Sequence, residues 1–569
     1  MMASPPRVLL ASLALVAAIA VTGPRAASRE PVRARHGMVG STDEHASRAG
    51  LQVLQRGGNA VDAAVAVGFA LAVTHPAAGN LGGGGFMVIR FADGRETTID
   101  YREVAPAAAT RDMFLDPAGE PVADRSRLGP LAAGVPGSVA GLTLAQRRYG
   151  RLPLAAVVAP AIALARDGFD VSWALSDSLQ EAKSLLTHFP ASARAFRRSD
   201  KTMVEHGDRL VQPDLARTLT LIAQQGPDAF YKGAIADLIA AEMTRTGGLI
   251  TKADLAAYAP RERPPIVGSY RGHRVVSMPP PSSGGIALVQ LLNILEKFPL
   301  AVYGHNSSRS IHLVAEAARR VYADRSEWLG DPDFFNVPVS GLLSPRYADA
   351  LRSGISETRA TPSRDVKPGL PRTFESSDTT HYSVVDAEGN AVATTTTLNG
   401  SYGNGQMVPG AGFLLNNEMD DFSAKPGTPN MFGLIGGQAN AVGPGKRMLS
   451  SMTPAILVKD GRTRLVLGSP GGSRIITTVL QVVLNVIDFK MNVQQAVDAP
   501  RFHHQWLPDA IRLEALGFPA DVVTALDAMG HTTEVGADMG DVHAIMIDQA
   551  SGLRLGASDP RLDGRTLGY

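Results

Sequence analysis

Residues 375–405 read ESSDTTHYSVVDAEGNAVATTTTLNGSYGNG. Two alternating segments flank an Asp-Ala-Glu-Gly-Asn turn, which predicts a β-hairpin with one buried face. The preceding residues 353–378 are polar, contain prolines and show no periodicity, so we expect them to be mobile. The chain therefore divides just before Thr379, which would head the first strand of the hairpin.

The sequence allows two interpretations of Thr379. Threonine favours strands, so a threonine at the start of a strand is most often only a β-former. If the bond between Asp378 and Thr379 were cut, however, Thr379 would carry a free α-amine beside its own hydroxyl and so supply base and nucleophile within one residue. An α-amine has a pKa of about 7.7 to 8.0, so much of it is neutral near physiological pH.

Composition excludes several classes of function. The 569 residues are 44% hydrophobic, enough for a large core, and length alone suggests roughly three or four domains. Lys and Arg total 55 against 54 Asp and Glu without basic or acidic blocks, so nothing marks a nucleic-acid surface. The absence of cysteine excludes a disulfide, a thiol nucleophile and a cysteine-ligated metal. A small molecule is the expected partner.

The N-terminus has the layout of a secretory signal. Arg7 precedes the apolar run Val8 to Val21 and a stretch of small residues. The run is shorter than the roughly 20 apolar residues of a membrane helix, and no later segment competes as a span. We therefore predict a signal peptide at residues 1–27 and export to the periplasm or medium, with an uncleaved N-terminal anchor as the alternative.

Further along, the chain alternates helical and strand patterns. Ser41 and Glu44 are spaced as a capping box, Gly57-Gly58 breaks the helical pattern, and the apolar segment Ala60 to Val73 predicts a second helix buried on nearly every face. A strand hairpin follows at residues 86–101, and helical patterns dominate from about 137 to 260. These patterns by themselves indicate only mixed α and β structure.

Eight motifs together carry a family resemblance. In chain order they are GNLGGGGFMV, DYREVAPAAATRDMF, MPPPSSGGI, TTHYSVVD, LLNNEMDDFS, RMLSSMTP, GSPGGSRII and APRFHHQW. Each is similar to a signature of the bacterial periplasmic γ-glutamyltransferases (γ-glutamyltranspeptidases), which are N-terminal-nucleophile hydrolases. The motifs occur in the family order and cover nearly the whole mature chain. The resemblance implies an α+β fold, the four-layer αββα sandwich. It also implies a precursor that cuts itself before Thr379 into a large subunit, 28–378, and a small subunit, 379–569, which together form one body.

The implied reaction moves a γ-glutamyl group. Glutathione and other γ-glutamyl compounds would be donors, water, amino acids or peptides would be acceptors, and no cofactor is needed. By resemblance, Thr379 is the autoprocessing residue and nucleophile, Thr397 hydrogen-bonds it, and Asn399 reaches the substrate's α-amino end. Gly471 and Gly472 resemble the backbone N–H pair of the oxyanion hole, where glycine lets the backbone approach the tetrahedral oxygen.

A γ-glutamyl group carries a zwitterionic head, so its pocket needs a cation and an anion. Arg102 resembles the carboxylate-binding arginine of the family, whose planar fork can grip two oxygens. Asp421 resembles the ammonium-binding aspartate, and Glu418 stands where the family has Gln or Glu. Ser450 and Ser451 resemble the hydroxyls that complete the carboxylate site. Outside these motifs, such charges would most often be solvated surface groups.

The segment Phe422 to Gly437 resembles the lid loop that covers the glutamyl pocket in part of the family. Phe432 stands where a tyrosine is common, so it keeps the ring and loses the hydroxyl. We expect closure to rest on apolar cover and not on a hydrogen bond.

Other signals are weak. His503 and His504 lack a spaced partner ligand, so we expect a structural role and no metal site, and no phosphate-binding or dinucleotide-binding loop has the required glycine spacing. Two alternative functions remain. One is a related acylase acting on glutaryl or cephalosporin-type amides, against which Asp421 argues because a glutaryl group has no ammonium. The other is an unprocessed periplasmic protein that binds glutamyl peptides without turnover.

Overall fold

The computed structural model describes residues 28–122, 124–371 and 380–569. The predicted hairpin is present as β10 (Thr380–Val385) and β11 (Ala391–Thr397), which pair antiparallel. The prediction of a single buried face is wrong, because every residue of β11 is buried and its two faces pack against different apolar clusters. The predicted signal peptide and Thr379 lie outside the described residues.

The hairpin occupies the middle of a seven-stranded antiparallel sheet. In spatial order its strands are β19 (Arg565–Gly568), β2 (Met38–Ser41), β10, β11, β3 (Gly84–Arg90), β4 (Glu96–Asp100) and β7 (Arg261–Arg263). Strands from before and after residue 379 thus alternate within one hydrogen-bonded layer.

A second seven-stranded antiparallel sheet packs on the first. Its order is β1 (Val32–Ala34), β18 (Arg554–Ser558), β17 (His543–Ile547), β13 (Arg462–Leu467), β12 (Ala455–Lys459), β9 (His273–Ser277) and β8 (Ile266–Tyr270). Smaller pairings are formed by β5 (Phe169–Asp170), β6 (Arg209–Leu210), β14 (Phe502–His503), β15 (Ile511–Glu514) and β16 (Thr533–Gly536).

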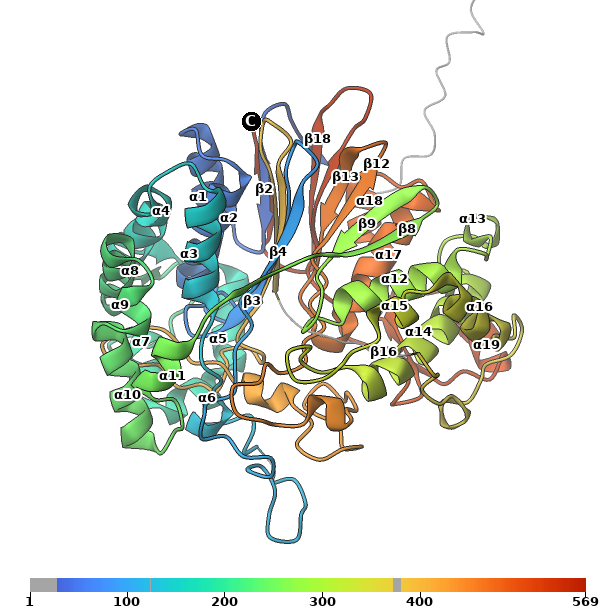
Figure 1. The fold of residues 1–569 in the computed structure, drawn as a ribbon. Coiled ribbons are helices and arrows are strands. Elements are labelled where there is room, and N and C mark those ends of the chain that lie inside the picture. The colour runs from blue at the N-terminus through green and yellow to red at the C-terminus, as the bar shows by residue number, and fades with distance from the viewer. Residues whose placement is uncertain (1–27, 123, 372–379) are drawn as a thin grey trace, which may run out of the picture.

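Helices cover the outer face of each sheet, which completes an αββα sandwich (Figure 1). On the first sheet lie α1 (Glu44–Gln55), α2 (Ala60–Thr74), α3 (Ser138–Tyr149), α4 (Leu154–Asp167), α5 (Trp173–Glu181), α6 (Lys183–His188), α7 (Pro190–Ala195), α8 (Pro213–Gln225), α9 (Asp228–Tyr231), α10 (Ala234–Thr246) and α11 (Lys252–Ala257). On the second lie α12 (Gly284–Leu295), α13 (Leu300–Tyr303), α14 (Ser308–Trp328), α15 (Val339–Leu342), α16 (Pro345–Ser353), α17 (Ile475–Ile487), α18 (Val493–Asp498) and α19 (Ala520–Ala528). The four-layer prediction is confirmed.

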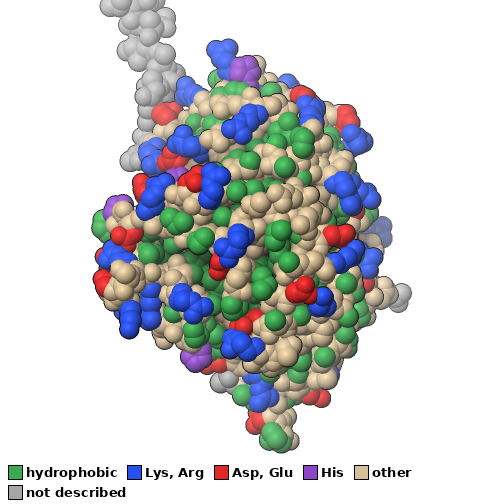
Figure 2. Space-filling model, turned by 90° about the vertical axis from the view of Figure 1, so that its left-hand side faces the viewer, with side chains coloured by type: hydrophobic (Ala, Val, Ile, Leu, Met, Phe, Trp, Pro, Cys, Tyr) green, Lys and Arg blue, Asp and Glu red, His purple; other side chains and the backbone are tan. Residues whose placement is uncertain are grey.

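Each interface between layers has its own apolar core. One cluster joins the first helical layer to its sheet, another joins the second layer to its sheet, and a third, which includes Phe86, Val276 and Ile456, fills the space between the sheets. Burial of apolar area is the main force holding such layers together. On the outer face of the first helical layer, basic and acidic side chains are scattered among hydrophobic and other residues (Figure 2).

The first helical hairpin confirms one prediction and corrects another. Every residue of α2 is buried, as its uniform apolar composition predicts, and Asn59 begins it with a capping box to Asp62. The predicted box of Ser41 and Glu44 is wrong. Ser41 ends strand β2, and the side chain of Asp43 caps α1 by accepting from the Ala46 N–H at 3.0 Å.

The segment after α16 is held in place as far as residue 371, so the expectation of mobility is wrong for residues 354–371. Asp324 accepts a hydrogen bond from the Gly369 N–H at 2.8 Å, and the Trp506 indole donates to the carbonyls of Ser363 and Val366 at 2.9 and 3.2 Å. Side-chain donors and acceptors replace the secondary structure that the sequence lacks here.

Candidate active site

A cavity of about 1100 Å³ opens beside the end of β11. Five residues singled out from the sequence line it: Thr397, Asn399, Phe432, Gly471 and Gly472. They come from segments up to 75 residues apart, by subtraction of 397 from 472, so the fold and not the local sequence brings them together.

Thr397 and Asn399 turn the chain at the end of the hairpin. The buried Thr397 Oγ1 accepts a hydrogen bond from the Asn399 N–H at 2.7 Å, so the hydroxyl proton is left to donate elsewhere. Asn399 has a φ of 74°, and its Nδ2 donates to the Asn417 carbonyl at 3.0 Å. Its buried Oδ1 has no hydrogen-bond partner among the described residues, so this oxygen can accept from a ligand.

Gly471 and Gly472 form the opposite wall. Their φ angles of 131° and 59° lie in the region that favours glycine. A Cβ on Gly472 would sit 2.7 Å from the Phe432 ring, so the ring packs directly on bare backbone. The pair begins the turn Gly472–Arg474, which leads into α17 and so lies at the positive end of a helix dipole.

Arg102 lies at the centre of a buried charge cluster. It is fully buried, its Nη2 lies 2.6 Å from Asp421 Oδ2, and its Nη1 lies 2.6 Å from Glu418 Oε2. Both acids belong to the single turn Glu418–Asp421. A third acid, Glu103, lies 3.6 Å from Arg102 Nη1. The structure therefore joins the three charged residues predicted to bind the substrate head, although more than 300 residues separate Arg102 from the other two.

Burial and charge shift the pKa values of this cluster in opposite directions. Burial raises the pKa of Asp421 to about 6, against the opposing attraction of Arg102. Burial raises the pKa of Glu103 further, to about 8. Burial would lower the pKa of Arg102, but Glu418, Glu103 and Asp421 outweigh it and raise the pKa above its ordinary value. Arg102 is therefore a permanent cation with an excess of acids around it.

Ser450 and Ser451 lie next to this cluster. Both are fully buried, and Arg102 donates to the backbone carbonyls of Met448 and Leu449, the two residues just before them, at 3.3 Å each. Arg325 of α14 reaches Ser451 Oγ at 3.5 Å. The predicted carboxylate-binding hydroxyls thus stand beside the predicted arginine.

The predicted lid is closed over this cluster. The Asn430 side chain donates to Asp421 Oδ1 at 3.1 Å and accepts from the Phe432 N–H at 3.0 Å. The Phe432 carbonyl accepts from Gln505 Nε2 at 3.2 Å. Closure by apolar cover alone is therefore wrong: the Phe432 ring does cover Gly472, but hydrogen bonds through Asn430 and Gln505 fasten the loop on both sides.

Sequence reasoning missed Glu103, Arg325, Asn430 and Gln505. Glu103 and Asn430 lie within or beside the motifs that carry the resemblance, so a search of those motifs for every polar residue could have found them. Arg325 stands in a charged helix segment with no motif, and nothing in its sequence neighbourhood marks it as buried.

The histidines support structural roles. Both nitrogens of His503 have partners, Thr477 Oγ1 at 2.7 Å and Gln505 Oε1 at 2.9 Å, and burial lowers the pKa of His503 to about 3. His504 lies between Arg319 and Asp509. Neither histidine belongs to a cluster of metal-ligand type within the described part of the chain.

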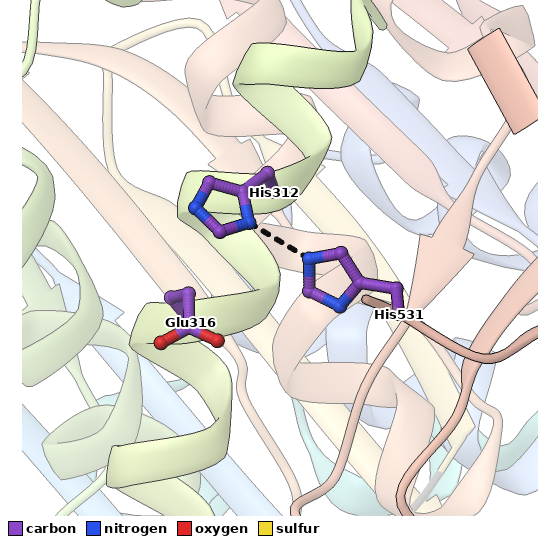
Figure 3. A group of neighbouring side chains, drawn as sticks. All are labelled: His312, Glu316 and His531. Carbon is purple, nitrogen blue, oxygen red and sulfur yellow. Dashed lines mark hydrogen bonds between the residues drawn. The ribbon is translucent and has the colours of Figure 1, made fainter. Parts of the chain in front are cut away.

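One group with metal-ligand chemistry does occur, namely His312, Glu316 and His531 (Figure 3). His312 Nδ1 and His531 Nε2 share a hydrogen bond of 2.7 Å, and Glu316 already pairs with Arg319 and Arg320. The positive charges of Arg319 and Arg320 beside the Glu316 carboxylate disfavour the binding of a metal cation there. The residues fit a polar anchor for the segment after α16, because Glu316 also accepts from the Thr361 N–H at 3.0 Å.

The layered fold and the glycine-lined cavity beside a buried charge cluster define the class of N-terminal-nucleophile hydrolases. The chain belongs to the γ-glutamyltranspeptidase family, whose model, described as Gamma-glutamyltranspeptidase, matches residues 46–569. Within the described residues, no helix has both the length and the apolar character needed to cross a bilayer.

Individual relatives agree. The chain is 56% identical over 540 residues to the glutathione hydrolase proenzyme of Escherichia coli (strain K12), a match that covers 95% of this chain and 93% of that protein. Its structure resembles a cephalosporin acylase from Bacillus halodurans with a TM-score of 0.84 and 29% identity, covering 97% and 99% of the two chains. A chain of Helicobacter pylori γ-glutamyltranspeptidase is 45% identical with a TM-score of 0.57, covering 61% of this chain and 97% of that one.

Proposed function

We propose that the protein is a self-processing γ-glutamyltransferase and glutathione hydrolase. The observation that carries the proposal is the buried cluster of Arg102, Glu418 and Asp421, which lies under the same lid that packs on Gly472. The cluster supplies a cation and two anions, and the glycines supply backbone N–H groups at the start of a helix. These two groups match the two ends of a γ-glutamyl amide. The charged head would bind the cluster, and the amide would lie at the glycines.

The charge pattern favours an amino-acid head over a simple acid. Arg102 is paired with its own acids, so a substrate carboxylate must bring an ammonium that replaces Arg102 as the partner of Asp421. The free Oδ1 of Asn399 adds a second acceptor for that ammonium. A glutaryl group lacks the ammonium and would leave Asp421 buried beside a second anion, which is costly. This argues against the acylase alternative, although an acylase shares the fold.

The chemistry that we propose needs no cofactor. The Thr379 hydroxyl attacks the γ-carbonyl carbon while the α-amine of Thr379 takes its proton, and Thr397 donates a hydrogen bond to the attacking oxygen. The N–H groups of Gly471 and Gly472 stabilise the tetrahedral oxyanion. The α-amine returns the proton to the departing amine, which leaves a γ-glutamyl ester on Thr379. Water or an acceptor amine then attacks the ester by the same route in reverse.

The same hydroxyl would first cut the chain. Attack by the Thr379 hydroxyl on the Asp378 carbonyl moves the acyl group from nitrogen to oxygen, which frees the α-amine and leaves an ester between Asp378 and Thr379. Water then hydrolyses this ester and divides the protein into subunits 28–378 and 379–569. We further propose that residues 1–27 direct export to the periplasm or medium, where γ-glutamyl compounds, amino acids and peptides are the partners.

Purified protein tests the proposal directly. A denaturing gel should show two bands, and the smaller should begin Thr-Thr-His-Tyr on N-terminal sequencing. The preparation should release aniline from a γ-glutamyl anilide, and faster with glycylglycine. Thr379→Ala should stay one chain, whereas Thr379→Ser should process and keep some activity.

Each alternative has its own result. A single band without turnover would support the binding protein, and two bands with activity on glutaryl amides but not γ-glutamyl amides would support the acylase. A small band with any other N-terminus would overturn the assignment of Thr379.

A further inference from the structure

The cavity extends past the glycine pair to two arginines. Arg474 and Arg512 both line it, together with Gly471 and Gly472. Arg474 ends the turn that Gly472 begins, and its own N–H donates to the Gly471 carbonyl at 3.1 Å. The turn therefore fixes the base of the Arg474 side chain relative to the two glycine N–H groups.

Arg474 is a partly buried cation without an acidic partner. Its side chain makes no ion pair or hydrogen bond with any residue in the described part of the chain. Burial lowers its pKa, and the charge of Arg512 lowers it further, so the two cations repel one another across the cavity. A third arginine on the same wall, Arg561, differs because Glu514 and Asp559 neutralise it.

Arg512 is only weakly compensated. Its Nε lies 3.4 Å from Glu534 Oε2, and both side chains are about half exposed, with 42% and 51% of their surface accessible. Exposed pairs of this kind contribute little. None of the acids that line the cavity forms an ion pair with Arg474 or Arg512: Asp541 pairs with His543, Asp43 caps α1, and Asp538 is exposed. Among the described residues, Glu534 is thus the one acid that pairs with either arginine.

The position of the two arginines fits one end of a peptide. Two extended residues span about 7 Å, and Arg474 lies two residues beyond Gly472, about 4 Å along a 3₁₀ turn. Because both residues line the same cavity, the long side chain of Arg474 can reach the terminal carboxylate of a dipeptide whose amine lies at the glycines. The amine that leaves the donor and the amine of the acceptor that attacks occupy the same place beside the glycines, because attack by the acceptor is the reverse of the departure of the first amine.

We propose that Arg474, assisted by Arg512, binds the terminal carboxylate of the peptide released from a γ-glutamyl donor and of the peptide that accepts the glutamyl group. The inference rests on the proposed function and adds the residues that recognise the second substrate through its free α-carboxylate. It makes Arg474 a specificity-determining residue of the cavity, whereas Arg102 does not line the cavity.

A pair of matched donors tests this. Glutathione and glutathione with a C-terminal amide differ only in the charge that Arg474 would contact. The parent enzyme should favour the acid over the amide by about tenfold in kcat/KM, as a charge-assisted hydrogen bond at a partly exposed site allows. In Arg474→Gln the kcat/KM values for the acid and the amide should differ by no more than about twofold. Arg474→Lys should restore part of the preference for the acid.

Acceptors give a second readout. The KM for glycylglycine should rise about tenfold in Arg474→Gln, whereas the KM for glycylglycinamide should change little. Arg462→Gln serves as the matched control, because Arg462 is exposed at the start of β13 and does not line the cavity. Cleavage into two subunits reports that each variant has folded.

The outcomes separate this inference from the proposed function. If the parent fails to hydrolyse γ-glutamyl anilide, the proposed function is wrong. If the parent turns over both glutathione forms and Arg474→Gln keeps the parent's preference for the acid, the carboxylate site is wrong and the function stands. Equal use of acid and amide by the parent would also overturn the inference.

Discussion

We propose that Arg102 is the residue on which recognition of the substrate head depends most. Its removal would break the buried ion pairs that it forms with Glu418 and Asp421, and breaking a buried pair in this way costs about 3 to 5 kcal/mol. We predict that Arg102→Ala lowers kcat/KM for γ-glutamyl anilide by roughly a hundredfold or more, and that Arg102→Lys recovers only part because an ammonium cannot grip both oxygens.

A donor without the α-carboxylate separates binding from folding. It should react poorly with the parent and lose little more in Arg102→Ala, provided that the variant still processes into two subunits. A processed Arg102→Ala with parental turnover of γ-glutamyl anilide would rule out the carboxylate site.

Asp421 should give the enzyme a distinct pH dependence. Burial raises its pKa to about 6, so it gains a proton as the pH falls through 6, and a neutral carboxyl cannot form an ion pair with the substrate ammonium. We predict that the KM for γ-glutamyl anilide rises as the pH falls from 7 to 5. Protonation of the Thr379 α-amine would instead lower kcat, and it would do so as the pH falls through about 8, near the ordinary pKa of an α-amine. Asp421→Asn should show a high KM that no longer changes between pH 5 and 7, and a parental KM that is flat over this range would contradict the assignment.

At the scale of elements, we propose that the loop from Phe422 to Gly437 controls entry to the charge cluster. The Phe432 ring contacts Gly472, while Asn430 and Gln505 hold the loop by hydrogen bonds. We predict that Phe432→Ala raises the KM for γ-glutamyl anilide by about tenfold, since an aromatic contact and its buried area are lost. Phe432→Tyr should keep parental kinetics within about threefold.

Phe334→Ala is the control for that comparison, because Phe334 is 56% exposed and lies outside the cavity. If Phe432→Ala and Phe334→Ala behave alike, the ring does not hold the loop closed.

The elements also show what a sequence can and cannot predict. Helix α2 could be predicted because its composition is apolar on every side, and the hairpin of β10 and β11 because two segments rich in β-favouring residues flank a turn sequence. The N-cap of α1 at Asp43 could not be predicted, because Ser41 fits the same capping pattern. Only the pairing of Ser41 within strand β2 places it outside the helix. The motifs named Arg102 and Asp421, but their direct contact depends on tertiary packing that spacing along the chain does not encode.

At the scale of the whole molecule, the two proposed subunits share both sheets. In the first sheet, β10 and β11 lie between β2 and β3, so strands from each side of residue 379 are neighbours. Neither subunit could complete a sheet by itself. We predict that the processed protein migrates as one species in size-exclusion chromatography, including in 1 M NaCl, and unfolds in a single thermal transition. Separation of the two subunits under native conditions would contradict this.

The same strand order has a consequence for biosynthesis. Strand β2, at residues 38–41, pairs with residues 380–385 and 565–568, so its two partners are translated hundreds of residues later. Pairings of such long range slow folding and leave strand edges exposed meanwhile. The nascent chain therefore cannot close its central sheet until residues 565–568 have been translated. An unfolded polypeptide is also the form that can thread through a narrow translocation channel, so late closure would keep the precursor competent for the export that its first residues predict.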